Sequence, residues 1–585
     1  MRLLPRLSAL VAFLLIASTA FADSSEDPLR LIPDKANLIV KIEQPRKLAE
    51  AITSLDAVKQ AQQLAILQPF IDSPQARRIF EFIAFYERDL GAKWPELLDK
   101  LAGGGIALGA KIQAGDENPL LLAVQGTDKA LVTKFVERVV YLFEEELKRG
   151  GSTDKVGRGK HHDIETLHFG KDIHGCRIGK ALLVSNKLDS LKAGIDQHFE
   201  NISKDSRHPN NMLHAAGTRK AKNLLPASPH LWLWYDFAYL KTLEEAKNLL
   251  TTPRDNTILT FGFAGILDIV RRSEFVAAGL YENKDGFALS IRMPAGRKGA
   301  ADDVDLHLPR DPKIAGTLPL LEPKGVIFSH SFYLDLATFW KDRTKIMTAE
   351  NAKDFENAIK QAGRFLPGSS FEKLFLQSGT HHRIVAANAP RPDYKIEPGT
   401  RLPAFAFVTS MREPAFGRSL EILVRGVAAF AGTQKIATKI FEEKYGDVKI
   451  LGYRFPEDGA FPGDDQNLRF NFMPTVAAVK DQYIFASTPD LCKELIDILL
   501  KEDRSKVIPQ NLQMKVYAKG GGDFLNASPE LLLTQTILSQ AIGEADAKKQ
   551  IEQLLKFAQK LGTVGIETDY AANEFRFDLK WKLNK

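Results

Sequence analysis

Cysteine is nearly absent from this chain: Cys176 and Cys492 are the only two among 585 residues. An exported protein of this size that depended on disulfide bonds would carry many more, so we expect apolar cores to provide the stability. Cys176 falls in an expected strand and Cys492 in an expected helix. We interpret both as buried, small apolar side chains; the alternative is a bridge between the two halves of the chain.

Long apolar runs are also missing beyond the first 22 residues. No later segment reaches the roughly 18 to 20 apolar residues of a membrane-spanning helix, so no transmembrane segment is expected there. A marked excess of charge is missing as well, because the formal net charge is +6 over 585 residues and falls to +4 once Arg2 and Arg6 are removed. Such a weak excess argues against a nucleic-acid partner.

Common catalytic motifs are absent too. The chain has no GxxxxGK[ST] phosphate loop, no HExxH helix, no GxSxG elbow and no set of SxxK, SDN and KTG motifs. The glycine runs Gly103–Gly105 and Gly520–Gly522 are interpreted as tight turns. The acidic segments 302–305 and 464–465 lack the calcium-loop pattern and are interpreted as solvated. The sequence thus favours a protein that is not an enzyme.

The first 22 residues have the pattern of a bacterial signal peptide. Arg2 and Arg6 give a positive start, Leu7–Ala17 is apolar, and Ala20-Phe21-Ala22 presents small residues at the cleavage positions. No cysteine follows, which argues against a lipid anchor. We predict cleavage after Ala22 and an extracytoplasmic mature protein, either periplasmic or secreted.

The second half of the chain repeats the order of the first at an offset of roughly 280 to 300 residues. A Leu-Pro opening before an apolar strand occurs at Leu31-Ile-Pro33 and returns as Leu321-Glu-Pro323. A proline-led strand that turns into a helix starts at Pro119 and again at Pro403, which places Val124 opposite Val408 at an offset of 284. Such repetition of order predicts internal duplication.

A third pair of segments supports the duplication most directly. ALLVSNKLDSLKAGID ends at Asp196, and QYIFASTPDLCKELID ends at Asp497. Four residues recur in them at an offset of 301: Asp189, Lys192, Ile195 and Asp196. The alternative is that any two α+β domains share the order strand, helix, strand.

The predicted fold class is α+β, with two homologous lobes in which helices cover mainly antiparallel sheets. Alternation of Phe575, Phe577 and Leu579 with polar residues predicts a strand of such a sheet. Apolar stripes at helical spacing predict helices around 131–147, 488–499 and 547–561. The predicted domains are a signal peptide (1–22), a first lobe (23–300), a linker (301–317) and a second lobe (318–585). Residues 201–228 are expected to form a surface loop.

One histidine-rich segment is the candidate metal site. It contains His161, His162, Asp163, Glu165, His168 and His174. In an extended strand His162 and His168 share a face, and His174 approaches across a hairpin, so His162, His168 and His174 form a candidate site for zinc or another divalent metal. The favoured alternative is a polar surface hairpin with no cofactor.

A run of aromatic residues from Trp232 to Tyr239 allows two interpretations. Trp232 and Trp234 share one face of a strand, where they could form a platform for a sugar or a lipid. Strands more often bury such residues, so we expect these side chains to lie in the core.

The Leu-Pro openings, the turn Leu101-Ala-Gly-Gly-Gly105 and the two endings in Ile-Asp resemble an uncharacterised family of exported bacterial proteins, known as a domain of unknown function. The resemblance covers nearly all of the mature chain. It implies an internally duplicated α+β architecture and no particular catalytic residues.

Two functions are compatible with these observations. The first, which we favour, is a non-catalytic envelope or secreted protein that binds a ligand or a partner. The second is a metal-assisted hydrolase that uses the His161–His174 region.

Overall fold

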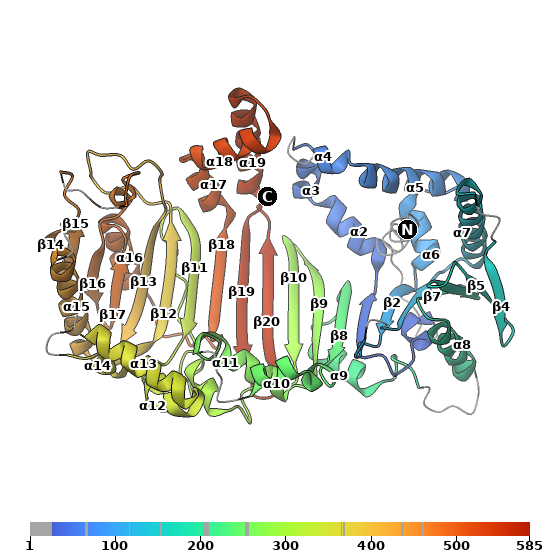
Figure 1. The fold of residues 1–585 in the computed structure, drawn as a ribbon, viewed down its shortest axis with the longest axis horizontal. Helices are drawn as coiled ribbons and strands as arrows, with labels where there is room; N and C mark the ends of the chain where they lie inside the picture. The colour runs from blue at the N-terminus through green and yellow to red at the C-terminus, as the bar shows by residue number, and fades with distance from the viewer. Residues whose placement is uncertain are drawn as a thin grey trace. The chain divides into compact units, whose positions relative to one another are not determined.

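The computed structural model describes residues 26–584 except 65–67, 116–117, 152–154, 203–209, 252–256, 364–365, 367–368, 434–437, 459–460 and 462. The predicted signal peptide and its cleavage site lie outside the described residues. The chain forms two compact units (Figure 1). Unit 1 is the chain up to Leu243 with Ser273–Pro294, and unit 2 is Glu244–Arg272 with Ala295–Lys585.

The strands of unit 1 form an antiparallel sheet in the order β4-β5-β6-β7-β3-β2-β1-β8-β9-β10. Their bounds are β1 (Leu38–Ile42), β2 (Gly105–Ala110), β3 (Leu120–Gln125), β4 (Gly157–His161), β5 (Ile164–His168), β6 (His174–Ile178), β7 (Ala181–Ser185), β8 (Leu231–Asp236), β9 (Phe275–Asn283) and β10 (Gly286–Met293).

Helices cover both faces of the unit 1 sheet. Ala123 of β3 packs with Leu191 and Ile195 of α8 on one face, and Val124 packs with Phe135 of α7 on the other. Burial on both faces explains why β3 reads as a continuous apolar run. The helices are η2 (Pro28–Leu31), α2 (Pro45–Ser54), α3 (Asp56–Ala61), α4 (Gln68–Ile71), α5 (Pro74–Leu90), α6 (Trp94–Ala102), α7 (Lys129–Arg149), α8 (Leu188–Ile202), α9 (Ala216–Leu224) and η4 (Leu240–Thr242).

The strands of unit 2 are antiparallel in the order β14-β15-β16-β17-β13-β12-β11-β18-β19-β20. Their bounds are β11 (Val326–Tyr333), β12 (Ser378–Ala387), β13 (Ala404–Met411), β14 (Lys439–Tyr445), β15 (Val448–Arg454), β16 (Thr475–Val479), β17 (Gln482–Ala486), β18 (Leu512–Tyr517), β19 (Thr563–Tyr570) and β20 (Phe575–Lys582).

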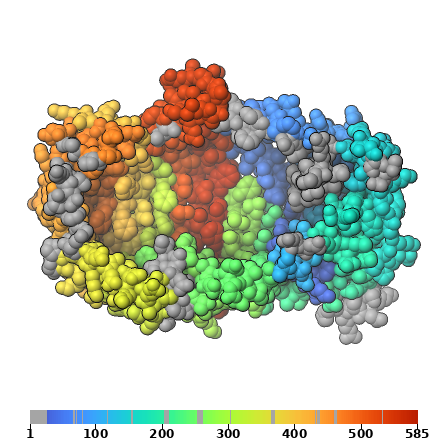
Figure 2. Space-filling view, in the orientation of Figure 1, coloured from blue at the N-terminus to red at the C-terminus, as the bar shows by residue number. Residues whose placement is uncertain are grey.

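Unit 2 is also covered on both faces. Ile484 of β17 packs with Leu495 of α16, and its neighbour Tyr483 packs with Phe416 of α15. Figure 2 shows α18 and α19 (red) above the strands of this unit. The helices are α10 (Glu244–Leu250), α11 (Thr257–Arg272), η5 (Asp302–Leu306), α12 (Leu336–Ile346), α13 (Ala349–Ala362), α14 (Phe371–Gln377), α15 (Pro414–Thr433), η7 (Leu468–Asn471), α16 (Pro489–Lys501), α17 (Ala518–Asn526), α18 (Glu530–Gln540) and α19 (Glu544–Lys560).

The α+β prediction with antiparallel strands is therefore confirmed. The two units also have the same order of strands, with β1 to β10 in the places of β11 to β20. The long connections fall at the same points: α7 and α15 follow the third strand, and α8 and α16 follow the seventh. The predicted lobes and their boundaries remain predictions, and residues 244–272 pack with unit 2.

One predicted register is wrong by a single residue. Ala123 pairs with Leu183 in unit 1, and Val408 pairs with Ile484 in unit 2. Leu183 and Ile484 are separated by 301 residues, as predicted, so Val408 corresponds to Ala123 and not to Val124. A shift of one residue moves a side chain to the other face of the sheet, so an identity between two valines is weaker evidence than strand pairing.

Three local predictions also need correction. Residues 201–228, expected to be a loop, include helix α9. Gly520–Gly522 lies inside α17 and is not a turn, because a Cβ at Gly520 would collide with the carbonyl group of Val326. The segment 301–317 is not a solvated linker throughout, since Leu306 and Leu308 are buried.

Candidate functional site

The predicted histidine site lies on the β4–β5 hairpin of unit 1. His161 ends β4 and pairs with Ile164, the first residue of β5, so His162 and Asp163 form a two-residue turn. His162 has a φ of +48°, a conformation that few residues other than glycine adopt. The chain reverses at His162, so His162 and His168 are not on one extended strand.

His162 lies with His161 and Asp196 instead of His168. The Nε2 atoms of His161 and His162 donate to the same oxygen, Oδ1 of Asp196, at 2.7 and 2.9 Å. Ligand atoms of these three residues all lie within 4.8 Å of one another, and they form the one such group of metal-binding side chains among the described residues. Asp196 is held there by α8, whose neighbouring residue Ile195 is fully buried in the core.

His168 and His174 form a second, separate contact. They are opposite each other on β5 and β6, and their Nδ1 atoms lie 2.9 Å apart. Burial, and then the neighbouring His168, lowers the pKa of His174. The predicted set of His162, His168 and His174 is thus divided between two contacts. The turn at His162 decides this, and its position cannot be read from the spacing of the histidines.

A second candidate site is a pocket of about 430 Å³ in unit 2. Its apolar lining comes from the strands and from the start of α15: Met411, Leu451, Val476, Ala477, Ala478 and Tyr483. Gly417 of α15 faces this lining, and a Cβ there would lie 3.3 Å from the sulfur of Met411 and 3.5 Å from the ring of Tyr483. A pocket of this size is suited to a small organic molecule.

Charged side chains also line this pocket, and most already have partners. Arg412 binds Asp335 at 2.7 Å, and Lys449 binds Glu421 at 3.2 Å. Arg418, on α15, is exposed and has no ion pair or hydrogen bond to any described residue. The free positive charge of the pocket therefore belongs to Arg418.

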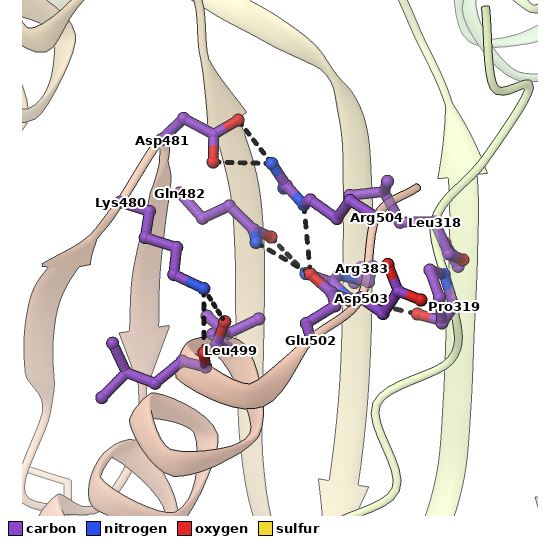
Figure 3. A network of polar contacts seen from close by, with 12 residues as sticks. Leu318, Pro319, Arg383, Lys480, Asp481, Gln482, Leu499, Glu502, Asp503 and Arg504 are labelled. Atoms are coloured by element: carbon purple, nitrogen blue, oxygen red, sulfur yellow. Dashed lines mark hydrogen bonds and ion pairs between the residues drawn. The ribbon is translucent and has the colours of Figure 1, made fainter. Parts of the chain in front are cut away.

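The other side of the pocket is held by a polar network (Figure 3). Lys480 donates to the carbonyl oxygens of Leu499 and Leu500 at the end of α16, at 3.1 and 2.9 Å. Asp481 accepts two hydrogen bonds from Arg504, at 2.6 and 2.5 Å. These contacts leave neither Lys480 nor Asp481 free to neutralise a ligand.

Behind Arg504 the network contains a buried ion pair. Arg383 of β12 donates to Glu502 and to Gln482, and the side chains of Arg383 and Glu502 are 1% and 6% exposed. Burial raises the pKa of Glu502, but hydrogen bonds from Arg383 and Gln482 outweigh it, so the pKa lies below the ordinary value. The pair is structural, because neither side chain lines the pocket.

Unit 1 has a buried cation of its own beside a smaller pocket of about 320 Å³. Lys41 is 2% exposed, and its Nζ lies 2.7 Å from both Asp27 and Glu43. Burial lowers the pKa of Lys41, but the two carboxylates raise it further, so the net shift is upward. Glu43 also accepts from the indole of Trp232 at 2.7 Å, so these charges satisfy one another.

The remaining sequence candidates have structural roles. Trp232 and Trp234 are buried in the core, as expected, and do not form a surface platform. Asp464 accepts from the backbone N–H groups of Leu468 and Arg469 at 2.6 and 3.2 Å, and so caps η7. Cys176 and Cys492 are both free and buried, and burial raises the pKa of each thiol to about 12.

Sequence analysis missed the pocket and one member of the histidine group. The pocket brings together residues from α15, β13, β15, β16 and β17, so no local motif marks it. Asp196 did carry a signal, because it is one of the residues that recur at an offset of 301. That signal marked a structural equivalence and not a ligand.

No family model and no curated protein matches this chain. Two solved structures are similar in part. Crystal form I of TP0453 is 10% identical over 48% of this chain and 82% of that chain, with a TM-score of 0.23. Crystal form III of TP0453 is 9% identical over 48% of this chain and 85% of that chain, with a TM-score of 0.24. Scores this low support no argument about the function of this chain.

Among the helices in the described residues, none combines the length and the apolar composition needed to cross a bilayer.

Proposed function

We propose that this protein is a non-catalytic, extracytoplasmic binding protein, and that the pocket of unit 2 takes a small ligand with an apolar body and one negatively charged group. The pattern of the first 22 residues supports export. The observation that carries the proposal is the combination of an apolar lining with Arg418, a cation that has no partner among the described residues.

The charges around the pocket argue for an anion in particular. The other lining cations are held by carboxylates or by carbonyl oxygens, so an anionic group would meet Arg418 without displacing an existing contact. Arginine also offers the two parallel donors that match a carboxylate. The volume of about 430 Å³ limits the ligand to a small molecule.

Calorimetric titration of the full chain with octanoate tests this proposal, and 1-octanol serves as the uncharged probe. A hydrogen bond to a charged group contributes about 1.5 to 3 kcal/mol. Arg418→Ala should therefore weaken octanoate binding by roughly 10- to 100-fold and leave octanol binding unchanged. Ala478→Trp should block both ligands, because Ala478 is an exposed residue of the lining.

Arg149→Ala is the matched control, since Arg149 is an exposed arginine on α7, the helix of unit 1 that corresponds to α15. It should bind octanoate like the unmodified protein. Absence of saturable octanoate binding, or equal binding by Arg418→Ala, would contradict the proposal.

A metal-assisted hydrolase is the second candidate. It would rest on His161, His162 and Asp196, which can hold a metal and leave a position for water. It is the weaker candidate because His168 and His174 pair with each other and not with His162. Hydrolysis that requires zinc and is lost in His162→Gly would favour it.

A further inference from the structure

We infer that His161, His162 and Asp196 form a binding site for a divalent transition-metal ion, of which Zn²⁺ is the test case. The site is in unit 1, and it is independent of the pocket proposed to bind the ligand. Two imidazole nitrogens and one carboxylate oxygen are a common ligand set for zinc. They lie within 4.8 Å of one another, so small side-chain rotations suffice to surround an ion.

The corresponding hairpin of unit 2 shows what a structural contact needs at this place. Tyr445 ends β14 as His161 ends β4, and its hydroxyl donates to Asp497 at 2.9 Å. Asp497 corresponds to Asp196 at the offset of 301. One donor therefore suffices to join the hairpin to the helix. Unit 1 has two donors on a single carboxylate oxygen, and the second imidazole is not needed for this contact.

The backbone of His162 gives an independent argument. His162 has a φ of +48°, and Gly446, at the same position of the unit 2 turn, has a φ of +59°. A residue with a side chain pays about 1 to 2 kcal/mol for a left-handed backbone, and glycine does not. A histidine at this position is therefore costly for folding alone, and metal binding by its imidazole offsets that cost.

The surroundings of the group allow an ion to enter. The side chains of His162 and Asp196 are 49% and 44% exposed. Phe199 of α8 packs against the His162 ring with centroids 4.6 Å apart and limits its rotation. Three protein ligands leave the fourth tetrahedral position for water.

Titration of the metal-free full chain, without a histidine tag, tests the inference. Calorimetry with ZnCl₂ should show one ion per chain, and Co²⁺ should give the visible absorption of a tetrahedral site. His162→Gly relieves the backbone and so keeps the fold, and Asp196→Asn keeps the shape of the side chain. Both variants should weaken binding by at least about 10-fold, in line with the loss of one ligand.

His168→Ala and His174→Ala are the matched controls, because they remove the neighbouring histidine pair from the same part of the sheet. Both should bind zinc like the unmodified protein. The inference is wrong if zinc does not bind saturably, if His162→Gly binds it unchanged, or if binding is lost in the control variants. Octanoate binding is measured in unit 2, so failure of one proposal does not affect the other.

Discussion

The hydroxyl of Tyr445 donates a hydrogen bond of 2.9 Å to Asp497. This contact joins the β14–β15 hairpin to α16, and His161 and Asp196 make the corresponding contact in unit 1 at 2.7 Å. Asp196 and Asp497 are among the residues that recur in the sequence. Their recurrence is explained by a shared position on the helix after the seventh strand, opposite the end of the fourth.

Tyr445→Phe should loosen this hairpin without unfolding the protein. The variant removes the only donor of the contact that a described residue supplies to Asp497. We expect faster amide hydrogen exchange in β14 and β15 and a small fall in melting temperature. Tyr453→Phe is the control on the next strand, because its buried hydroxyl has no hydrogen-bond partner among the described residues. It should be neutral or stabilising, and similar exchange in both variants would contradict the assignment.

Breaking the buried pair of Arg383 and Glu502 should strongly destabilise the protein. Glu502→Leu leaves the Arg383 guanidinium buried without its carboxylate, which costs about 3 to 5 kcal/mol. Arg383→Met combined with Glu502→Leu removes both charges and should recover most of that loss. Urea denaturation gives the free energies of unfolding. A double variant no more stable than Glu502→Leu would show that the charges themselves are needed.

His330 should make stability depend on pH. Burial lowers its pKa from 6.5 to about 4, so between these values the unfolded chain binds a proton that the folded chain does not. Stability is then fully present above pH 6.5 and falls as the pH is lowered from 6.5 towards 4. The loss is at most about 3 kcal/mol, and less because the ring is partly exposed.

His330→Phe tests this dependence directly. The Nε2 atom of His330 has no hydrogen-bond partner among the described residues, and the ring stacks on Phe332 at 4.8 Å, so phenylalanine preserves the packing. The variant should be more stable than the unmodified protein at pH 5 and differ little at pH 8. Thermal melts at both values measure it. An unchanged pH slope would mean that His330 is not the titrating group.

Removal of metal should leave the fold intact. The proposed ligands lie on one hairpin and one helix of a unit whose cores contain no metal ligand other than buried Cys176. A large apolar core does not depend on one ion, unlike a small zinc domain. Melting curves with and without EDTA should coincide. A large fall in melting temperature with EDTA would show that the ion holds unit 1 together.

The mature protein should begin at Asp23. Small residues at Ala20 and Ala22 follow the apolar segment, as signal peptidase requires. The intact mass of the protein recovered outside the cytoplasm measures the start. A start several residues away, or a retained N-terminus, would contradict this prediction.

Much of the fold could be predicted because its signals are local. Apolar residues at helical spacing in 131–147 and in 488–499 correspond to α7 and α16. Thr488 caps α16, and Pro489 occupies its first turn. Alternation from Phe575 to Leu579 corresponds to β20. Periodicity reflects which side of each element faces the core, so it is visible without knowing the neighbours of that element.

The candidate sites could not be predicted in the same way. The metal candidates depended on where the chain turns, and the turn at His162 placed this residue with Asp196, 34 residues away in the sequence. Arg418 became a candidate only because its neighbours Arg412 and Lys449 have partners supplied by other elements. Contacts of this kind arise when distant segments meet.

The sequence by itself determined the antiparallel α+β class, the recurring order of segments and the absence of common catalytic motifs, because each is a property of residue type and spacing. The tertiary structure alone decided the pairing of Val408 with Ile484, the division of the histidines into two contacts and the lining of the pocket. A one-residue change in register or a single tight turn alters which side chains meet while leaving every local pattern unchanged.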